Sequence, residues 1–174
     1  MEQGQIQVYT GNGKGKTTAA IGLSIRALGA GKKVYMGQFI KDMEYSECSI
    51  LKALPGMTLE LYGSGDGCFI DRVPQQKDLD AAAEGIRKIK EAMISGQYDV
   101  VIADEINVAW ALKLLEKEAF LGLADSKPED VELIFTGRGC PQFILDRADL
   151  ITEMKEVRHY YTEKGLLSRK GIEC

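Results

Sequence analysis

The stretch Thr10-Gly11-Asn12-Gly13-Lys14-Gly15-Lys16-Thr17-Thr18 decides the fold of this chain. Its three glycines let the backbone turn its N–H groups inward around phosphate oxygens. Lys16 brings a positive charge to the same oxygens, and Thr17 offers a hydroxyl group to a magnesium ion. The stretch therefore predicts a loop in which residues 11–18 bind a nucleoside triphosphate.

The sequence on either side of this loop supports the interpretation. Residues 6–9 alternate as in a strand, and the mostly apolar residues 19–28 are typical of a helix. The start of that helix would direct its positive dipole end at the anion. The standard pattern G-x-x-x-x-G-K-[ST] has glycine where this chain has Thr10, and the alternative is a glycine-rich turn without a ligand. The strand–loop–helix order favours the phosphate loop.

Length and composition narrow the class of protein. The 174 residues predict one domain, 1–174, and a net charge of −4 without a lysine–arginine block disfavours nucleic acid as a partner. No apolar run approaches the length of a membrane span, and the first strand begins too early to leave room for a signal peptide. The four cysteines lack C-x-x-C spacing and are typical of a reducing compartment. We therefore expect a cytoplasmic protein with no membrane partner.

Strands and helices alternate along the rest of the chain. This order predicts an α/β fold of the P-loop NTPase type, with a mostly parallel central sheet between two layers of helices. The tail from Lys155 has no clear period. Strands are expected at 6–9, 34–39, 57–62, 99–103, 131–135 and 150–154, and helices at 16–28, 44–54, 75–95, 106–115, 118–123 and 142–147.

Polar clusters follow five of the expected strands. In parallel sheets, ligands bind at the carboxyl ends of the strands, which lie along one rim. We therefore expect that rim to carry most of the chemistry. The clusters span residues 10–18, 38–42, 63–72, 104–105 and 136–140.

Two of these clusters supply charged groups suited to a magnesium–phosphate site. Asp104 and Glu105 follow the apolar residues 100–103, and a carboxylate at the end of a buried strand beside a phosphate loop is placed to hold magnesium. The spacing does not decide which carboxylate contacts the ion, and the alternative role is to cap the next helix. Arg138, between two glycines, is suited to bind phosphate through two N–H groups, or else is a surface arginine in a turn.

The sequence lacks the usual groups of nucleophilic catalysis. The only histidine, His159, lies in the tail, so no serine–histidine or cysteine–histidine pair can be argued. We expect His159 to be a surface or hydrogen-bonding residue. The residues alone predict an enzyme that acts on a magnesium–nucleoside triphosphate, and they do not name the acceptor.

Several segments resemble the ATP:corrinoid adenosyltransferases that act on cob(I)alamin and cob(I)yrinic acid a,c-diamide. The resemblance covers nearly the whole chain from Gln5, and the family carries threonine at the position of Thr10. The phosphate loop is common to many enzymes, whereas the later segments are much more specific. The segments are GNGKGKTTAAIGL (11–23), GQFIK (37–41), DVVIADEI (99–106), LIFTGRGCPQFILDRADLITEM (133–154) and KGIE (170–173).

The resemblance implies a reaction that explains the missing base. Cobalt(I) of a corrinoid attacks the 5′ carbon of ATP, and the triphosphate leaves intact. The reduced cobalt is itself the nucleophile, so the protein holds ATP in reach and stabilises the growing charge. Lys16 would neutralise the triphosphate, Thr17 and Glu105 would hold Mg²⁺, and Arg138 would contact phosphate. ATP would lie reversed in the loop, with its 5′ carbon toward the corrinoid.

The resemblance also implies a role for the glycine-rich loop at residues 63–74. Phe69 matches an aromatic residue that helps displace the lower ligand of the corrin ring; the alternative is that it pins the loop to the core. The family usually continues with Thr-Trp, where this chain has Ile70-Asp71. Lys16, Glu105 and Phe69 are thus the expected catalytic residues, although the way the lower ligand is excluded is left open.

The family further implies partners and leaves two alternative functions. An electron donor such as a flavoprotein reductase would reduce the corrinoid, the protein would serve cobalamin biosynthesis, and a homodimer is common in the family. We expect this chain to lack the family's usual N-terminal extension, in which case another element or a second subunit would cover the corrinoid. One alternative is a phosphate-loop kinase or ATPase in which Glu105 orients water or a hydroxyl group. The other is a nucleotide-binding subunit without turnover.

Overall fold

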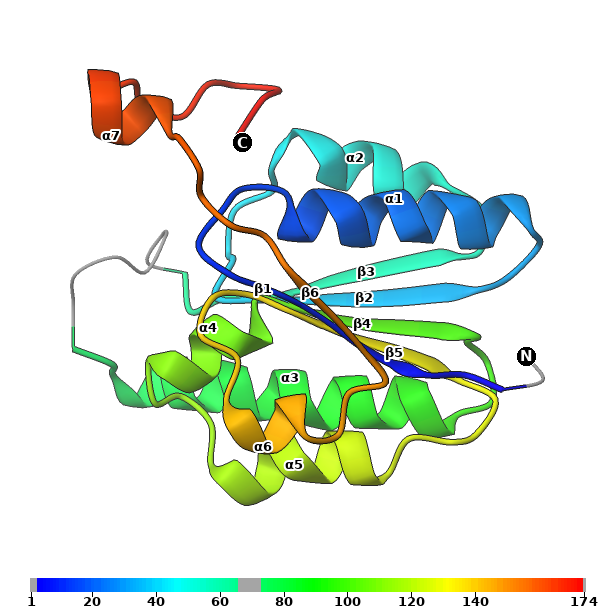
Figure 1. Cartoon of the computed structure of the whole chain (residues 1–174). Helices are drawn as coiled ribbons and strands as arrows, with labels where there is room; N and C mark the ends of the chain where they lie inside the picture. The colour runs from blue at the N-terminus through cyan, green and yellow to red at the C-terminus, as the bar shows by residue number, and fades with distance from the viewer. Residues whose placement is uncertain (1–2, 66–72, 174) are drawn as a thin grey trace.

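Six parallel strands form the central sheet of the protein (Figure 1). The structure is a computed structural model that describes residues 3–65 and 73–173. The strands lie in the order β3-β2-β4-β5-β1-β6, and every neighbouring pair is parallel. Their bounds are β1 Ile6–Thr10, β2 Val34–Phe39, β3 Met57–Tyr62, β4 Val100–Asp104, β5 Glu132–Thr136 and β6 Leu150–Glu153.

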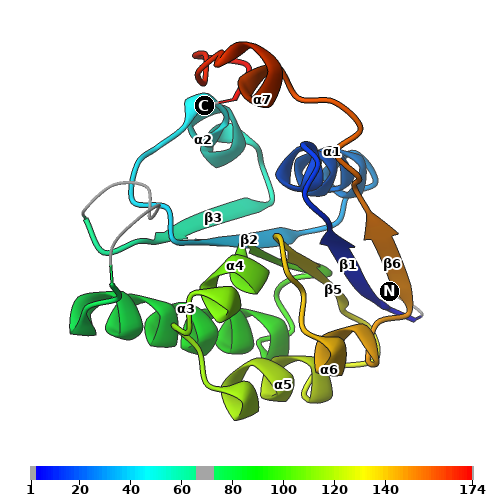
Figure 2. The same cartoon turned by 60° about the vertical axis from the view of Figure 1, so that its left-hand side comes forward.

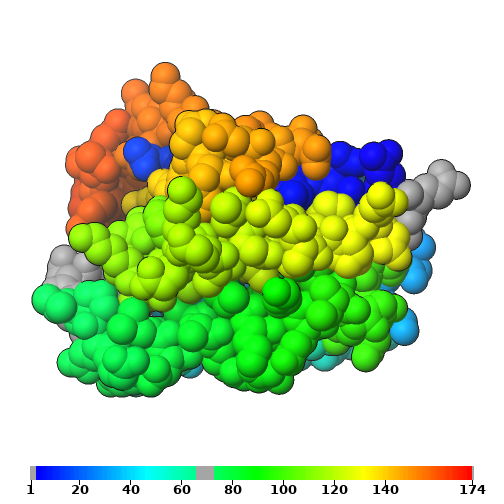
Figure 3. Space-filling view, turned by 90° about the horizontal axis from the view of Figure 1, so that it is seen from below, coloured from blue at the N-terminus to red at the C-terminus, as the bar shows by residue number. Residues whose placement is uncertain are grey.

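Helices cover both faces of this sheet, which confirms the predicted three-layer α/β fold. Figure 2 shows α1 and α2 on one face, and α3, α4, α5 and α6 on the other. Figure 3 looks onto the second face, where α3, α5 and α6 lie side by side. The helices are α1 Lys16–Gly29, α2 Ser46–Ala53, α3 Gln76–Ile94, α4 Ile106–Ala111, α5 Lys117–Asp125, α6 Gln142–Leu145 and α7 Tyr160–Lys164.

Two apolar clusters, one on each face, hold the layers together. Successive side chains of a strand point to opposite faces, so Met36 and Ile102 pack beneath α1 and α2, while Tyr35 and Val101 pack toward α3. Because helices cover both faces, every residue of β2, β4 and β5 is buried. None of the helices in the described part of the chain is long and apolar enough to cross a membrane.

Helix α4 is shorter than the helix predicted at residues 106–115. It ends at Ala111 because Lys113 adopts a left-handed conformation with φ of 59°. The Lys113 N–H then donates to the Trp110 carbonyl, and the Leu114 N–H donates to the Ala109 carbonyl. This pair of bonds is a Schellman motif, here with lysine where glycine is usual.

The tail contains a helix that the sequence did not predict. Helix α7 has five residues, so it is too short to show a helical period. It begins where the His159 Nδ1 accepts a hydrogen bond from the Tyr161 N–H at 3.1 Å, and it ends at Gly165 with φ of 63°. This confirms His159 as a hydrogen-bonding residue.

Candidate active site

The carboxyl ends of the strands bring the described candidate residues to one rim of the sheet (Figure 1). The phosphate loop follows β1, Asp104 ends β4, and Arg138 follows β5. This placement confirms the predicted rim for the described clusters. Phe69 and Ile70-Asp71 lie outside the described residues.

Two glycines of the phosphate loop lie where a side chain would collide with the backbone just after β6. A β-carbon on Gly11 would lie 2.5 Å from the Met154 carbonyl oxygen, and one on Gly13 would lie 2.7 Å from the same atom. The Gly13 N–H donates to that oxygen at 2.6 Å. Gly11 and Gly15 have φ of 94° and 117°. The loop therefore needs glycine both for its conformation and for its contact with the chain after β6.

Lys16 crosses the loop and binds its backbone. Its Nζ donates to the carbonyl oxygens of Gly11 at 2.8 Å and Gly13 at 2.7 Å, and the residue is buried. Burial lowers the pKa of Lys16, while the charge of Glu105 raises it and that of Arg138 lowers it. The ammonium group thus lies inside the loop, where a phosphate group would replace the two carbonyls as its partner. Asn12 and Thr18 were also predicted to bind ATP. Asn12 is exposed on the loop, and Thr18 is exposed in the first turn of α1.

Asp104 organises the rim through four hydrogen bonds. Its Oδ1 accepts from the hydroxyls of Thr17 at 2.8 Å and Thr136 at 2.6 Å. Its Oδ2 accepts from Gln38 Nε2 at 2.9 Å and Lys41 Nζ at 3.2 Å. Because Thr17 donates its proton to Asp104, the lone pairs of that hydroxyl are left for a cation. This arrangement fits a magnesium site beside Thr17.

Glu105 follows Asp104 in the chain. Among the described residues, none donates a hydrogen bond to the Glu105 carboxylate. Its backbone has φ of 59°, and its N–H donates to the Thr136 hydroxyl at 2.9 Å. Burial and the neighbouring Asp104 raise the pKa of Glu105, whereas Lys41, Lys16 and Arg138 lower it. A divalent cation bound to the Glu105 carboxylate would provide the positive partner that this carboxylate lacks among the described residues. The carboxylates that the sequence could not separate therefore have different surroundings.

Two of the residues predicted to contact phosphate, Arg138 and Lys14, are exposed. Arg138 is exposed on the rim, yet its charge is close enough to lower the pKa of both Lys16 and Glu105. Lys14 turns toward the end of the chain: its Nζ donates to Glu173 Oε1 at 3.0 Å, to the Ile172 carbonyl at 3.0 Å and to the Tyr160 hydroxyl at 3.4 Å. Glu173 belongs to the terminal KGIE segment, but its contact with the loop was not predicted.

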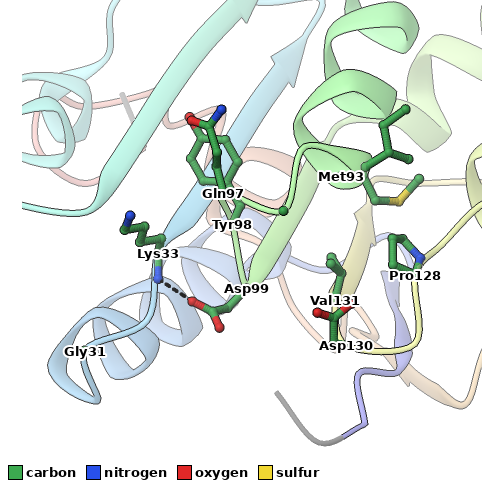
Figure 4. A pocket seen from close by; sticks show the side chains of 11 residues that line it. Gly31, Lys33, Met93, Gln97, Tyr98, Asp99, Pro128, Asp130 and Val131 are labelled. Atoms are coloured by element: carbon green, nitrogen blue, oxygen red, sulfur yellow. Dashed lines mark hydrogen bonds between the residues drawn. The ribbon is translucent and has the colours of Figure 1, made fainter.

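A separate cavity lies at the opposite rim, between the amino ends of the strands. It measures about 370 Å³ and is lined by Lys33, Tyr98, Asp99, Asp130 and seven other residues (Figure 4). The Lys33 N–H donates to Asp99 Oδ2 across its edge at 2.8 Å. None of the predicted site residues that the structure describes lines this cavity, so it is distinct from the phosphate loop.

Comparison with known proteins gives consistent matches along the chain. The family model described as ATP:corrinoid adenosyltransferase BtuR/CobO/CobP matches residues 2–174. The corrinoid adenosyltransferase of Escherichia coli K12 is 34% identical over 172 residues, which cover 99% of this chain and 86% of the relative. Corrinoid adenosyltransferase CobA of Salmonella typhimurium LT2 is 34% identical over 178 residues, with the same two coverages.

A cyanobacterial relative is longer than this chain. An uncharacterised protein of Nostoc sp. is 37% identical over 190 residues, but this chain spans only 48% of its length. The family model and the enterobacterial relatives cover almost all of the residues that build the fold and the rim. The chain therefore belongs to the ATP:corrinoid adenosyltransferase family.

Proposed function

We propose that this protein transfers the 5′-deoxyadenosyl group of ATP to the cobalt(I) of a corrinoid and releases triphosphate. The observation that carries the proposal is the contact between Thr17 and Asp104 within a phosphate loop of this family. The contact fixes the Thr17 hydroxyl, and the Gly11 and Gly13 carbonyls hold the neighbouring Lys16 inside the loop proposed to bind the triphosphate. Cobalamin or cobyrinic acid a,c-diamide would be the acceptor.

The proposed reaction is a displacement at carbon. The cobalt(I) of the substrate forms a bond with the 5′ carbon, the bond from that carbon to the phosphate oxygen breaks, and the triphosphate leaves with the electron pair. No proton is transferred, so no general base is required. The protein instead binds ATP with its 5′ carbon toward the corrinoid and stabilises the charge of the leaving triphosphate.

The described residues divide this work between them. The backbone of residues 11–18 would bind the triphosphate, Lys16 would neutralise it, and Arg138 would contact it from the rim. Thr17 and Glu105 would hold Mg²⁺, with Asp104 fixing the Thr17 hydroxyl. When bound, the ion neutralises part of the triphosphate charge. For Phe69 we keep the role that the family implies, displacement of the lower ligand of the corrinoid.

Product analysis tests the proposal directly. The protein is incubated without oxygen with ATP, Mg²⁺ and chemically reduced cobalamin, and the products are separated by chromatography. We expect adenosylcobalamin and intact triphosphate in equal amounts, and Lys16→Ala to reduce both by about a hundredfold or more. ADP and phosphate as the only products would contradict the transfer. Turnover that needs no corrinoid and is lost in Glu105→Gln would instead identify a kinase or ATPase.

We also propose the setting in which this activity operates. Cobalt(I) must be generated by reduction, so an electron donor such as a flavoprotein reductase is the expected partner. The thiols of Cys48 and Cys140 are free, which supports a reducing compartment such as the cytoplasm. By analogy with the family, we propose a homodimer that serves cobalamin biosynthesis.

A further inference from the structure

A second lysine, Lys41, lies beside the candidate site from the opposite side of Asp104. Its Nζ donates to Asp104 Oδ2 at 3.2 Å, while Thr17 occupies the other oxygen of the same carboxylate. Only 14% of the Lys41 side chain is exposed, and Asp104 is fully buried. The ammonium group and the proposed magnesium-binding hydroxyl are thus separated by one carboxylate.

The backbone before Lys41 is held in an unfavourable conformation. Ile40 has φ of 67°, in a region that β-branched residues rarely adopt. The Ile40 N–H donates to the Tyr62 carbonyl at 3.1 Å, which ties the turn to the end of β3. The turn packs closely against Gly63, where a β-carbon would lie 2.5 Å from the Lys41 carbonyl carbon. Backbone strain of this kind clusters at active sites and ligand clamps, where the surrounding structure maintains it.

The bonds of Lys41 leave part of its donor capacity unused. An ammonium group has three N–H donors, and Asp104 is the only hydrogen-bond acceptor of Lys41 in the described structure. The ring of Tyr45 lies 5.3 Å from Nζ and provides a cation–π contact. Burial lowers the pKa of Lys41, but the charge of Asp104 and the hydrogen bond to it outweigh this effect and raise the pKa. The group is therefore charged and holds a donor for another ligand.

We propose that Lys41 is a further catalytic residue, which donates a hydrogen bond to the triphosphate of ATP while it remains on Asp104. The inference rests on the proposed function, because it takes a nucleoside triphosphate as the ligand. Lys16, Lys41 and Arg138 would then surround the anion from the ends of three strands, against the charges of Asp104 and Glu105. As the triphosphate leaves the 5′ carbon, Lys41 would stabilise the negative charge that it carries away.

The simpler role for Lys41 is to neutralise Asp104 alone. In that case its removal would weaken the fold but would not alter the affinity of the folded protein for polyphosphate. The strained turn argues for more than neutralisation, because a lysine on a relaxed backbone can pair with a carboxylate. Here Ile40 is strained, and the backbone of Lys41 packs closely against Gly63.

Binding of inorganic tripolyphosphate with Mg²⁺, measured by calorimetry without corrinoid, separates the two roles. We expect Lys41→Met to raise the dissociation constant about 10- to 100-fold, the usual effect of losing a charged hydrogen bond. Lys41→Arg should restore binding to within about threefold, since arginine keeps the charge and the donors. Lys33→Met, at the opposite rim, is the matched control and should bind like the wild type.

A second variant guards against loss of the fold. Lys41→Gln keeps a hydrogen-bond donor for Asp104 without the charge, and thermal unfolding shows which variants are folded. Folded Lys41→Gln or Lys41→Met protein with unchanged tripolyphosphate affinity would overturn the inference and leave the proposed function intact. If the wild type itself does not bind tripolyphosphate, the inference falls together with the triphosphate site. Adenosylcobalamin formation by the wild type reports separately on the proposed function.

Discussion

Single residues at the rim owe their roles to contacts that differ even between neighbours. Asp104 uses both carboxylate oxygens to hold four donors, including Thr17. Glu105 turns away through a left-handed backbone, and its carboxylate packs against Gly137. Asp104 therefore holds the rim together, and Glu105 is the carboxylate that we propose binds the cation.

The contact between Gly137 and Glu105 leads to a first prediction. Gly137 has φ of 124°, and a β-carbon there would lie 3.1 Å from Asn107 Cβ and 3.2 Å from Glu105 Oε2. Gly137→Ala should displace the Glu105 carboxylate, reduce Mg²⁺-dependent adenosyl transfer about tenfold or more, and lower the free energy of unfolding by about 1–3 kcal/mol. Activity assays and urea unfolding measure the two effects.

A glycine in the same turn provides the control. Gly139 also has a positive φ, 70°, but its β-carbon would meet only Ala111 Cβ, at 3.9 Å. Gly139→Ala should cost stability through its backbone and leave transfer close to that of the wild type. Equal losses of activity in both variants would show that backbone strain, not the contact with Glu105, is responsible.

Cys140, next to this turn, leads to a second prediction. Burial raises the pKa of the Cys140 thiol to about 12. In the folded protein the thiol keeps its proton well above the ordinary value, so alkylation by iodoacetamide should be slow and should accelerate as the pH approaches that pKa. Mass spectrometry of the Cys140 peptide measures the rate, and the protein unfolded in urea, with a pKa of about 8.5, is the control.

The same shift has a consequence for stability. Because the folded pKa lies above the unfolded one, the folded state binds the proton more tightly, and this contribution to stability is lost as the pH rises from about 8.5 toward the folded value. Rapid labelling of Cys140 in folded protein near neutral pH would contradict the burial of the thiol.

For single residues, the sequence indicated which side chains belong to the candidate site better than it indicated their hydrogen-bond partners. Lys16 and Thr17 were recognised because glycine, lysine and threonine at this spacing have one physical use. The spacing left open which carboxylate contacts the ion, and it gave no sign that Asp104 would bind Thr17, because both depend on the backbone turn at Glu105. Lys14 was predicted to bind phosphate. Its contact with Glu173 could not be predicted, because the two residues are far apart in the sequence.

The C-terminal segment, residues 160–173, contains one short helix, α7, and is held in place mainly by side-chain contacts. Glu173 holds it together: its carboxylate accepts from Lys14 Nζ, Tyr160, and the backbone and side chain of Arg169. Arg169 is the largest cause of the lowered pKa of Glu173, followed by Tyr160. The hydrogen bond between Lys14 and Glu173 therefore connects this segment to the phosphate loop.

A third prediction concerns this contact. Glu173→Gln should release the segment, and hydrogen exchange should increase at residues 160–173 and at Lys14, with little change in the temperature of global unfolding. Glu163→Gln is the matched control, because among the residues that the structure describes the Glu163 carboxylate forms an ion pair only with Arg158, on the exposed surface. Equal exchange in the two variants would show that Glu173 does not anchor the segment.

The direction of the pKa shift gives the pH range of the contact. The folded pKa of Glu173 is lowered, so the stabilisation is complete above the unfolded value of about 4.3 and is lost only as the pH falls through the lower folded pKa. The segment should remain protected from exchange in mildly acidic solution.

The regular elements were largely predictable, and the exceptions have physical causes. Buried strands such as β2 and β4 show as apolar runs because helices cover both faces. The early end of α4 depends on a lysine in a left-handed conformation, which no propensity favours. Helix α7 has five residues and is exposed. The His159 side chain caps its start and Gly165 ends it, so it shows no helical period in the sequence.

The whole molecule places its charged rim at one end of the sheet and its cores on the two faces. The alternation of strands and helices predicted this rim, since parallel strands all end on the same side. The strand order β3-β2-β4-β5-β1-β6 was not predicted, because it depends on how each connection crosses the sheet. The chain therefore shows which residues share a rim, but only the fold shows which of them touch.

A fourth prediction belongs to this scale. Tripolyphosphate with Mg²⁺ should raise the unfolding temperature, since a ligand at a hundred times its dissociation constant stabilises a protein by about 2.7 kcal/mol. Adenosine should have a much smaller effect, and removal of Mg²⁺ by a chelator should weaken the response, because Glu105 would lose its cation. Differential scanning calorimetry measures these shifts. A larger shift from adenosine than from tripolyphosphate would contradict a site built around phosphates.

The position of the chain ends has a practical consequence. The Gly4 N–H donates to the Glu129 carbonyl near the amino ends of the strands, whereas Glu173 reaches Lys14 at the rim with the phosphate loop (Figure 1). An affinity tag fused beyond Glu173 would disturb the loop that we propose binds the nucleotide. A tag fused before Gln3 would hang from the remote side, so preparations that differ only in tag placement should give different nucleotide affinities.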